Sequence, residues 1–74
     1  MEFLIEEDER TDNRLILHTK RGIPDDLIKD VKRIMGVEEI LRPTGYRLCL
    51  TISKLNDKFE VMEKIKDLLD RKYL

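Results

Sequence analysis

The sequence predicts a small α+β domain in which two amphipathic helices cover one face of a four-stranded antiparallel sheet. Two kinds of apolar pattern support this prediction. Strict alternation, clearest in residues 46–53, is typical of strands, whereas two other segments repeat their apolar residues at helical period. A chain of 74 residues is expected to form one domain, spanning residues 1–74.

The first two strands are expected to form a β-hairpin. A short apolar run at residues 3–6 ends in the acidic residues 6–9, and residues 11–13 (Thr-Asp-Asn) have turn chemistry because Asp and Asn hydrogen-bond their own backbone. Residues 14–19 then alternate between two faces, as a strand does. The acidic residues offer oxygen ligands to a hard cation, but their spacing matches no calcium motif, so we expect a solvated turn.

Pro24 is expected to lie in the first turn of the first helix, where its missing N–H costs nothing. Asp25 and Asp26 follow, where negative charge complements the helix dipole. Gly36 stands where a left-handed C-terminal cap is expected. Between these ends the apolar residues have helical spacing, and they are Leu27, Ile28, Val31, Ile34 and Met35.

The second half of the chain repeats the order strand, strand, helix. We expect a third strand at residues 37–41, a turn at residues 43–45 (Pro-Thr-Gly) and a fourth strand at residues 46–53. Asp57 begins the last helix with the spacing of a capping box. The apolar stripe of that helix is expected to be core rather than a binding groove, and it contains Phe59, Met62, Ile65, Leu69 and Tyr73.

The element order ββαββα predicts a sheet with strand order 1-2-4-3, antiparallel throughout, in a two-layer sandwich of ferredoxin-like type. Each helix has one apolar stripe, so both must cover the same face of the sheet. The strand residues expected to face the helices are Leu15, Leu17, Leu48, Leu50 and Ile52. Those expected on the uncovered face are Arg14, Ile16, His18, Lys20, Arg47, Cys49 and Thr51.

Composition limits the possible classes of function. The chain carries 15 Lys and Arg against 16 Asp and Glu, so its net charge does not steer it toward phosphate. No apolar run approaches the ~18 residues of a membrane span, and the first residues lack the features of a signal peptide. A single Cys excludes an intramolecular disulfide. We therefore expect a cytoplasmic protein that does not associate with membranes.

The chain combines a Thr/Asn-type turn at residues 11–13, a helix ending in Gly36-Val37 before a short strand, and a closing helix after residues 46–54. It resembles the N-terminal domain of Nfu/NifU-type iron–sulfur cluster scaffold proteins. In that family the cluster ligands lie in a Cys-x-x-Cys motif on a separate domain, and this sequence contains no such motif. The segment before the first helix, residues 20–23, is also shorter than in the family. The resemblance implies an adaptor role, iron–sulfur assembly proteins as partners and no cofactor on this chain.

Metal and catalytic chemistry have little support in the residues. A tetrahedral metal site needs four ligands, and Cys49 with His18 supplies half of one, so only a symmetric dimer could complete it. The same two residues have the composition of a thiol–imidazole pair, but no motif positions a third group and an open sheet face excludes little water. We therefore predict no metal site and no enzymatic activity.

Two binding functions remain open. A nucleic-acid-binding site would use Arg14, Lys20, Arg21 and Arg47, but the expected open face offers no Phe or Tyr for base stacking. A protein-binding site would use the open face, where Ile16 and an outward-facing Leu4 would be apolar among charges. We favour a non-enzymatic interaction module, a monomer or weak homodimer, that docks a protein partner through Ile16, His18, Arg47, Cys49 and Thr51.

Overall fold

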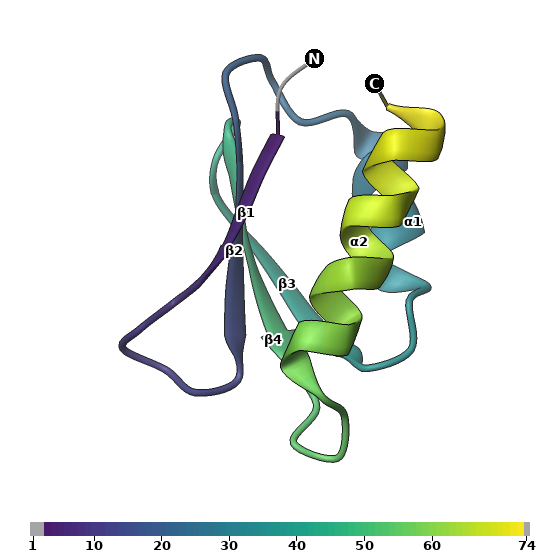
Figure 1. Ribbon diagram of the computed structural model, residues 1–74. Coiled ribbons are helices and arrows are strands. Elements are labelled where there is room, and N and C mark those ends of the chain that lie inside the picture. The colour runs from purple at the N-terminus through teal and green to yellow at the C-terminus, as the bar shows by residue number, and fades with distance from the viewer. Residues whose placement is uncertain (1–2, 74) are drawn as a thin grey trace.

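The computed structural model describes residues 3–73 and has the predicted element order (Figure 1). Met1, Glu2 and Leu74, which the predicted domain includes, lie outside the described residues. The elements are β1 (Phe3–Glu7), β2 (Arg14–Thr19), α1 (Asp25–Lys32), β3 (Val37–Thr44), β4 (Arg47–Ile52) and α2 (Lys58–Lys72).

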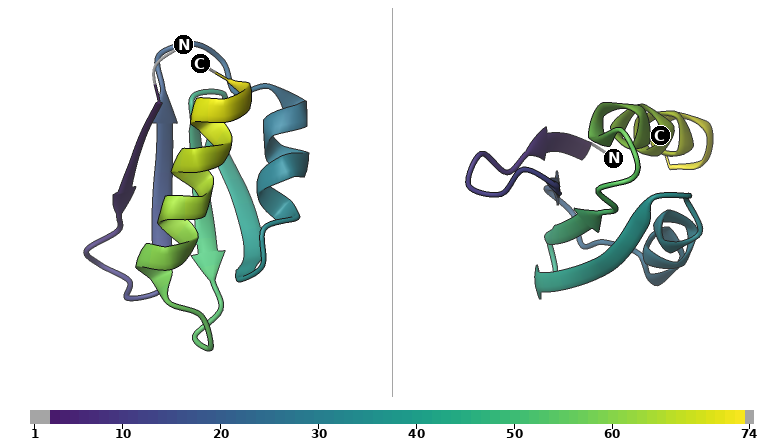
Figure 2. Two further views of the ribbon diagram at one scale, coloured as in Figure 1. Left: turned by 45° about the vertical axis from the view of Figure 1, so that its right-hand side comes forward. Right: turned by 90° about the horizontal axis from the view of Figure 1, so that it is seen from below.

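The four strands form one antiparallel sheet in the order β1-β2-β4-β3, which confirms the predicted topology. Both helices lie on the same side of this sheet, α1 against β3 and α2 against β1 and β2 (Figure 2). The other side, which we call the open face, has no helix over it. The fold is therefore a two-layer α+β sandwich.

The hydrophobic core lies between the sheet and the helices. In β2 and β4 every second residue is buried, because successive side chains of a strand point to opposite faces. All five strand residues predicted to face the helices are confirmed as core: Leu15, Leu17, Leu48, Leu50 and Ile52. The helices contribute the buried residues Leu27, Val31, Val61, Met62, Ile65 and Leu69.

The first helix ends earlier than the sequence predicts. Residues 33–36 form a turn instead of a last helical turn, and Arg33 N donates to Asp30 O at 3.2 Å. A backbone bond across three residues rather than four tightens the chain and ends the α-helix. Gly36 has the expected left-handed conformation, with φ of 101°, but it serves the entry into β3 rather than the helix C-cap. Met35 of the predicted stripe is consequently exposed.

The second hairpin also turns later than predicted. β3 continues through Pro43 to Thr44, and the turn consists of Gly45 and Tyr46. Proline is tolerated there because β3 is an edge strand, where a missing N–H need not break a ladder bond. A register shift between Leu41 and Thr44 accommodates the irregularity. Tyr46 is therefore an exposed turn residue and not the first residue of β4.

Phe59 does not belong to the core, so its assignment to the buried stripe is wrong: it is 56% exposed. The reason is helical geometry, since at about 100° per residue Phe59 lies about 120° around α2 from Ile65, in the middle of the buried stripe. Met62 is buried as predicted. Asp57 is confirmed as the N-cap, because its carboxylate accepts the N–H of Phe59 at 2.9 Å.

Asp30 of α1 links the two helices. Its Oδ2 accepts hydrogen bonds from Lys72 Nζ at 2.8 Å and from the Tyr73 hydroxyl at 2.7 Å. The bond from Lys72, followed by the bond from Tyr73, holds the pKa of Asp30 below its usual range. Burial and the same bond raise the pKa of Tyr73, so its hydroxyl stays a donor at neutral pH. The charge on Asp30 therefore stabilises the folded state.

This link predicts a pH-dependent effect of Asp30→Asn, which removes the charge and keeps the shape. Because the folded-state pKa is depressed, the stabilisation is complete above the pKa of the unfolded chain, about 3.9, and is lost as the pH falls through the folded value. We expect the variant to lower Tm by a few degrees at neutral pH and to have almost no effect near about pH 2. Thermal unfolding followed by circular dichroism measures this.

The matched control is Asp12→Asn, which makes the same change at an exposed position of the first hairpin. It is expected to leave Tm nearly unchanged at both pH values. A Tm difference for Asp30→Asn that stays constant from neutral to acid pH would contradict the stabilising role of the Asp30 charge.

Candidate functional site

The middle of the open face is apolar. Glu6, Ile16, Cys49 and Leu41 lie opposite one another in register, one from each of β1, β2, β4 and β3. Directly opposed side chains on one face of a sheet have Cβ atoms about 5 Å apart, so neighbours in this line touch. Ile16 and Cys49 are half-buried, and Leu41 at the edge is 49% exposed. Ile16, Cys49 and Leu41 therefore form an apolar row across three strands.

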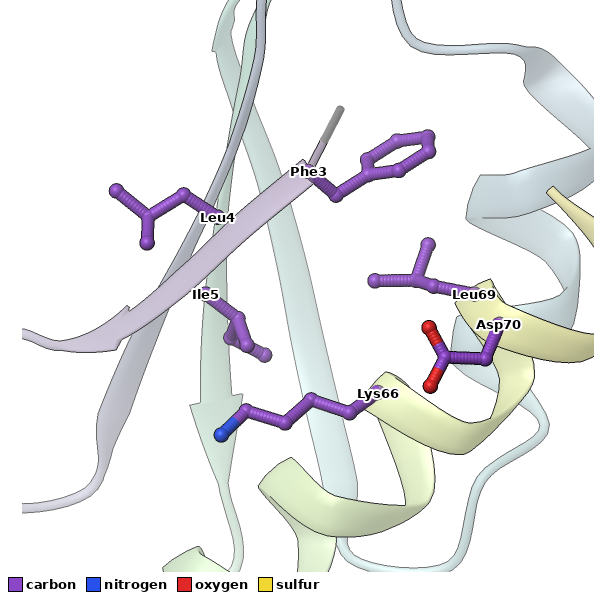
Figure 3. Close-up of a pocket in the computed structure, with 6 residues that line it drawn as sticks. All are labelled: Phe3, Leu4, Ile5, Lys66, Leu69 and Asp70. Carbon is purple, nitrogen blue, oxygen red and sulfur yellow. The ribbon is translucent and has the colours of Figure 1, made fainter. Parts of the chain in front are cut away.

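The next row toward the β3–β4 turn is more polar and contains Leu4, His18, Arg47 and Thr44. His18 Nε2 lies 2.9 Å from Glu6 Oε1, so the imidazole is held by a carboxylate of the middle row. Leu4 is 58% exposed and points away from α2 (Figure 3). Arg47 is exposed and has no ion pair within residues 3–73.

The row on the other side of the apolar row consists of Arg14, Thr51 and Glu39. Arg14 is partly buried, and its Nη1 lies 3.8 Å from Asp8 Oδ2. The apolar row is therefore bordered by charged or polar side chains on both sides.

Asp8 corrects the expectation that residues 6–9 form a solvated turn. Its carboxylate is buried, and Oδ1 accepts the backbone N–H of Arg10 at 3.0 Å. This backbone bond outweighs the desolvation and lowers the pKa of Asp8, with further help from the charges of Arg10 and Arg14. Asp8 therefore organises the β1–β2 loop, a structural role that accounts for its burial.

The structure brings all five predicted partner-binding residues to the open face, namely Ile16, His18, Arg47, Cys49 and Thr51. In particular, His18 and Cys49 share this side of the sheet, in adjacent rows. Leu41 and Glu39, which extend the face onto β3, are not among the residues predicted from the sequence. Alternation along β3 could have indicated them, but the register shifts in that strand break the pattern.

The four basic residues of the nucleic-acid hypothesis are not equally available. Arg14 is held beside Asp8, and Lys20 is also engaged in an interaction. Arg21 and Arg47 are exposed and have no ion pair in the described part of the chain. Among the described residues that the register places on the open face, none is Phe, Tyr or Trp. Base stacking on this face would therefore have to use the His18 imidazole, which is already held by Glu6.

Neither His18 nor Cys49 lines either of two surface grooves in the described part of the chain. These grooves, of about 280 and 350 Å³, lie elsewhere: one between β1 and α2 (Figure 3), the other around residues 52–58. Within residues 3–73, no three His, Cys, Asp or Glu side chains are grouped so that they could hold a metal ion. In the same range, neither helix is long and apolar enough to cross a membrane.

Comparison of the chain with protein-family models, with curated proteins and with solved structures found no match. The open face is therefore the feature of this protein that indicates a function.

Proposed function

We propose that this protein is a non-enzymatic interaction module that binds a protein partner through the open face of its sheet. The observation that carries the proposal is the apolar row of Ile16, Cys49 and Leu41, which lies in the middle of a face with charged residues on both sides. Protein interfaces have this anatomy, with an apolar centre that excludes water and a polar rim that sets orientation.

The rim indicates what the partner must present. Arg47 is exposed without an ion pair in residues 3–73, so it is available to a carboxylate of the partner. Leu4, on the same row, offers further apolar area. A complementary surface would therefore carry an apolar side chain to cover Cys49 and an Asp or Glu to meet Arg47.

The resemblance to Nfu/NifU-type N-terminal domains suggests the partner. We propose an iron–sulfur assembly protein, in particular one that carries the Cys-x-x-Cys motif which this sequence lacks. On this proposal the present chain holds no cluster and acts as an adaptor, with Cys49 as an apolar contact residue rather than a cluster ligand.

The test is a titration of the ¹⁵N-labelled chain with a purified Cys-x-x-Cys scaffold domain from the same source, followed by amide NMR. Chemical-shift changes should concentrate at Ile16, Leu41, Arg47 and Cys49. Ile16→Glu places a charge in the apolar row and should weaken binding by at least about tenfold, since an unpaired charge would be buried in the interface. Leu55→Glu is the matched control, because Leu55 is 97% exposed in the β4–α2 loop, away from the sheet.

Other outcomes would contradict the proposal. Equal losses in both variants would mean that the open face is not the contact surface. Binding of oligonucleotides at low salt that disappears at high salt, and that depends on Arg21 and Arg47, would support the nucleic-acid alternative instead. No binding to the scaffold domain would reject the iron–sulfur partner.

A further inference from the structure

The outer edge of β1 has backbone groups that β2 does not use. Asp8, just after the strand, donates its N–H to Arg14 O at 3.0 Å. In an antiparallel pair, alternate residues face the partner strand, so Leu4 and Glu6 also bond to β2. The N–H and C=O groups of Phe3, Ile5 and Glu7 therefore point away from the sheet, where they can pair with another strand.

The two edges of the sheet differ in how well they can accept another strand. β3 contains Pro43, two register shifts and a row of exposed charged residues, which all discourage pairing. β1 has no proline, and its pairing with β2 is regular from Phe3 to Glu7. The β1 edge is therefore the one suited to strand addition.

A groove runs beside this edge on the helix side of the sheet. Phe3 and Ile5 point toward α2, and Leu69 faces them from the helix (Figure 3). Lys66 and Asp70, one helical turn apart, line the same groove. A strand added to β1 would place alternate side chains into this β1–α2 groove.

We propose that the occupant is a second copy of this chain, joined antiparallel through β1 about a two-fold axis at Ile5. In this register Ile5 lies opposite Ile5 of the other copy, and Phe3 lies opposite Glu7. The antiparallel direction keeps the acidic ends of the two β1 strands apart, whereas a parallel pair would bring them together. The two four-stranded sheets become one sheet of eight strands.

The helix layer fits the same symmetry. Strands in a sheet lie about 4.8 Å apart, so the proposed two-fold axis lies half a strand spacing from each β1 strand. Because α2 packs over β1 and β2, the axis of α2 lies a further half spacing away, roughly one strand spacing from the two-fold axis. The two α2 helices would then lie about 10 Å apart, a distance at which helices pack directly. The dimer therefore closes the groove with a second helix.

The charges in the groove complement one another across the axis. Ile5, Lys66 and Asp70 line the same groove, so a two-fold axis at Ile5 would bring both charges of one copy near those of the other. Two antiparallel copies of α2 place Lys66 of each copy next to Asp70 of the other. In the single chain Lys66 Nζ lies 3.6 Å from Glu63 Oε1, an exposed contact; in the dimer it would pair with Asp70 of the other copy, which gives two equivalent ion pairs. This self-complementarity favours a second copy over an unrelated extended peptide, and the association leaves both open faces uncovered.

Sedimentation equilibrium of the full chain should detect a monomer–dimer equilibrium. Lys66→Asp and Asp70→Lys each bring like charges together and should raise the dimer Kd by at least about tenfold. The double variant, which exchanges the two charges, should restore the wild-type Kd. Both positions are exposed in the single chain, so the folds should survive, and circular dichroism checks this. Lys64→Asp, at an exposed α2 position outside the groove, should have no effect.

Three results would overturn the proposal: a monomer at about 1 mM, a dimer unchanged by either single variant, or a double variant no better than the single ones. Independently of any variant, isotope-filtered NMR of a mixture of labelled and unlabelled wild-type chain should give contacts between the two Ile5 backbones. Contacts elsewhere would reject this interface. Ile16→Glu, which should weaken partner binding through the open face, should leave the β1 dimer intact. The dimer and the proposed partner binding can therefore be rejected independently of each other.

Discussion

Replacing Leu50 by Ala is expected to lower the free energy of unfolding by about 2–5 kcal/mol, because it leaves a cavity that the surrounding core can fill only partly. Leu50 is fully buried in the central strand β4. It lies opposite Leu15 on β2 and Ile40 on β3, on the face that the helices cover. A domain this small has a total stability near the lower end of about 5–15 kcal/mol, so the variant should be close to unfolding at room temperature.

Cys49→Ala is the matched control, since it truncates the preceding residue of the same strand, which faces the open side of the sheet. It is expected to cost less than about 1 kcal/mol, because Cys49 is half-buried with no helix above it. Urea unfolding of both variants, followed by circular dichroism, measures the difference. Similar losses would mean that the two faces of the sheet are not covered as described.

The strand faces and the topology could be predicted because they depend on patterns that are local in the sequence. Alternation in β2 and β4 separates Leu15 and Leu48 from Ile16 and Cys49 whatever the rest of the chain does. Two amphipathic helices must then cover the same face, and two hairpins joined by a helix restrict the strand order. The sequence therefore sufficed for the sheet order that the structure has.

The ends of elements could not be predicted, because they depend on contacts between distant segments. α1 ends before Ile34, although the apolar spacing continues, since the chain must turn to enter β3 at Gly36. Pro43 lies inside β3, although Pro-Thr-Gly at residues 43–45 has the composition of a turn, because β3 continues to pair with β4 as far as Thr44. Phe59 has an apolar side chain near the stripe of α2 but lies too far around the helix to reach the core.

The residues of the candidate site also divide into those that could be predicted from the sequence and those that could not. The residues on the two central strands could be assigned to the open face from alternation alone. Leu41 could not, because its pairing with Cys49 depends on the shifted register of β3. In the sequence Glu6 belongs to the acidic run of residues 6–9, and only the pairing of β1 with β2 places it beside Ile16 and within 2.9 Å of His18. Asp8 differs from its acidic neighbours through burial and hydrogen bonds that no sequence pattern indicates.

Gly36→Ala is the second change for which we expect a large effect, a loss of about 2–5 kcal/mol in the free energy of unfolding. Two costs add. The backbone of Gly36 has φ of 101°, a conformation that costs other residues about 1–3 kcal/mol. A Cβ would also lie 2.9 Å from Val61 Cγ2 and 3.1 Å from Asn56 Cβ, and such overpacking costs about 1–3 kcal/mol.

Both costs are specific to this position, because Gly36 lies where the α1–β3 turn meets the β4–α2 loop. The Gly36 carbonyl accepts the N–H of Ser53 at 2.7 Å, so a displaced backbone would also weaken the hydrogen bond that joins these two segments. Gly45→Ala is the matched control, since a Cβ there meets nothing within 4 Å and its φ is not left-handed. Urea unfolding should separate the two variants by more than about 1.5 kcal/mol. If both alanine variants unfold at the same urea concentration, neither the left-handed backbone nor the close contact with Val61 constrains residue 36.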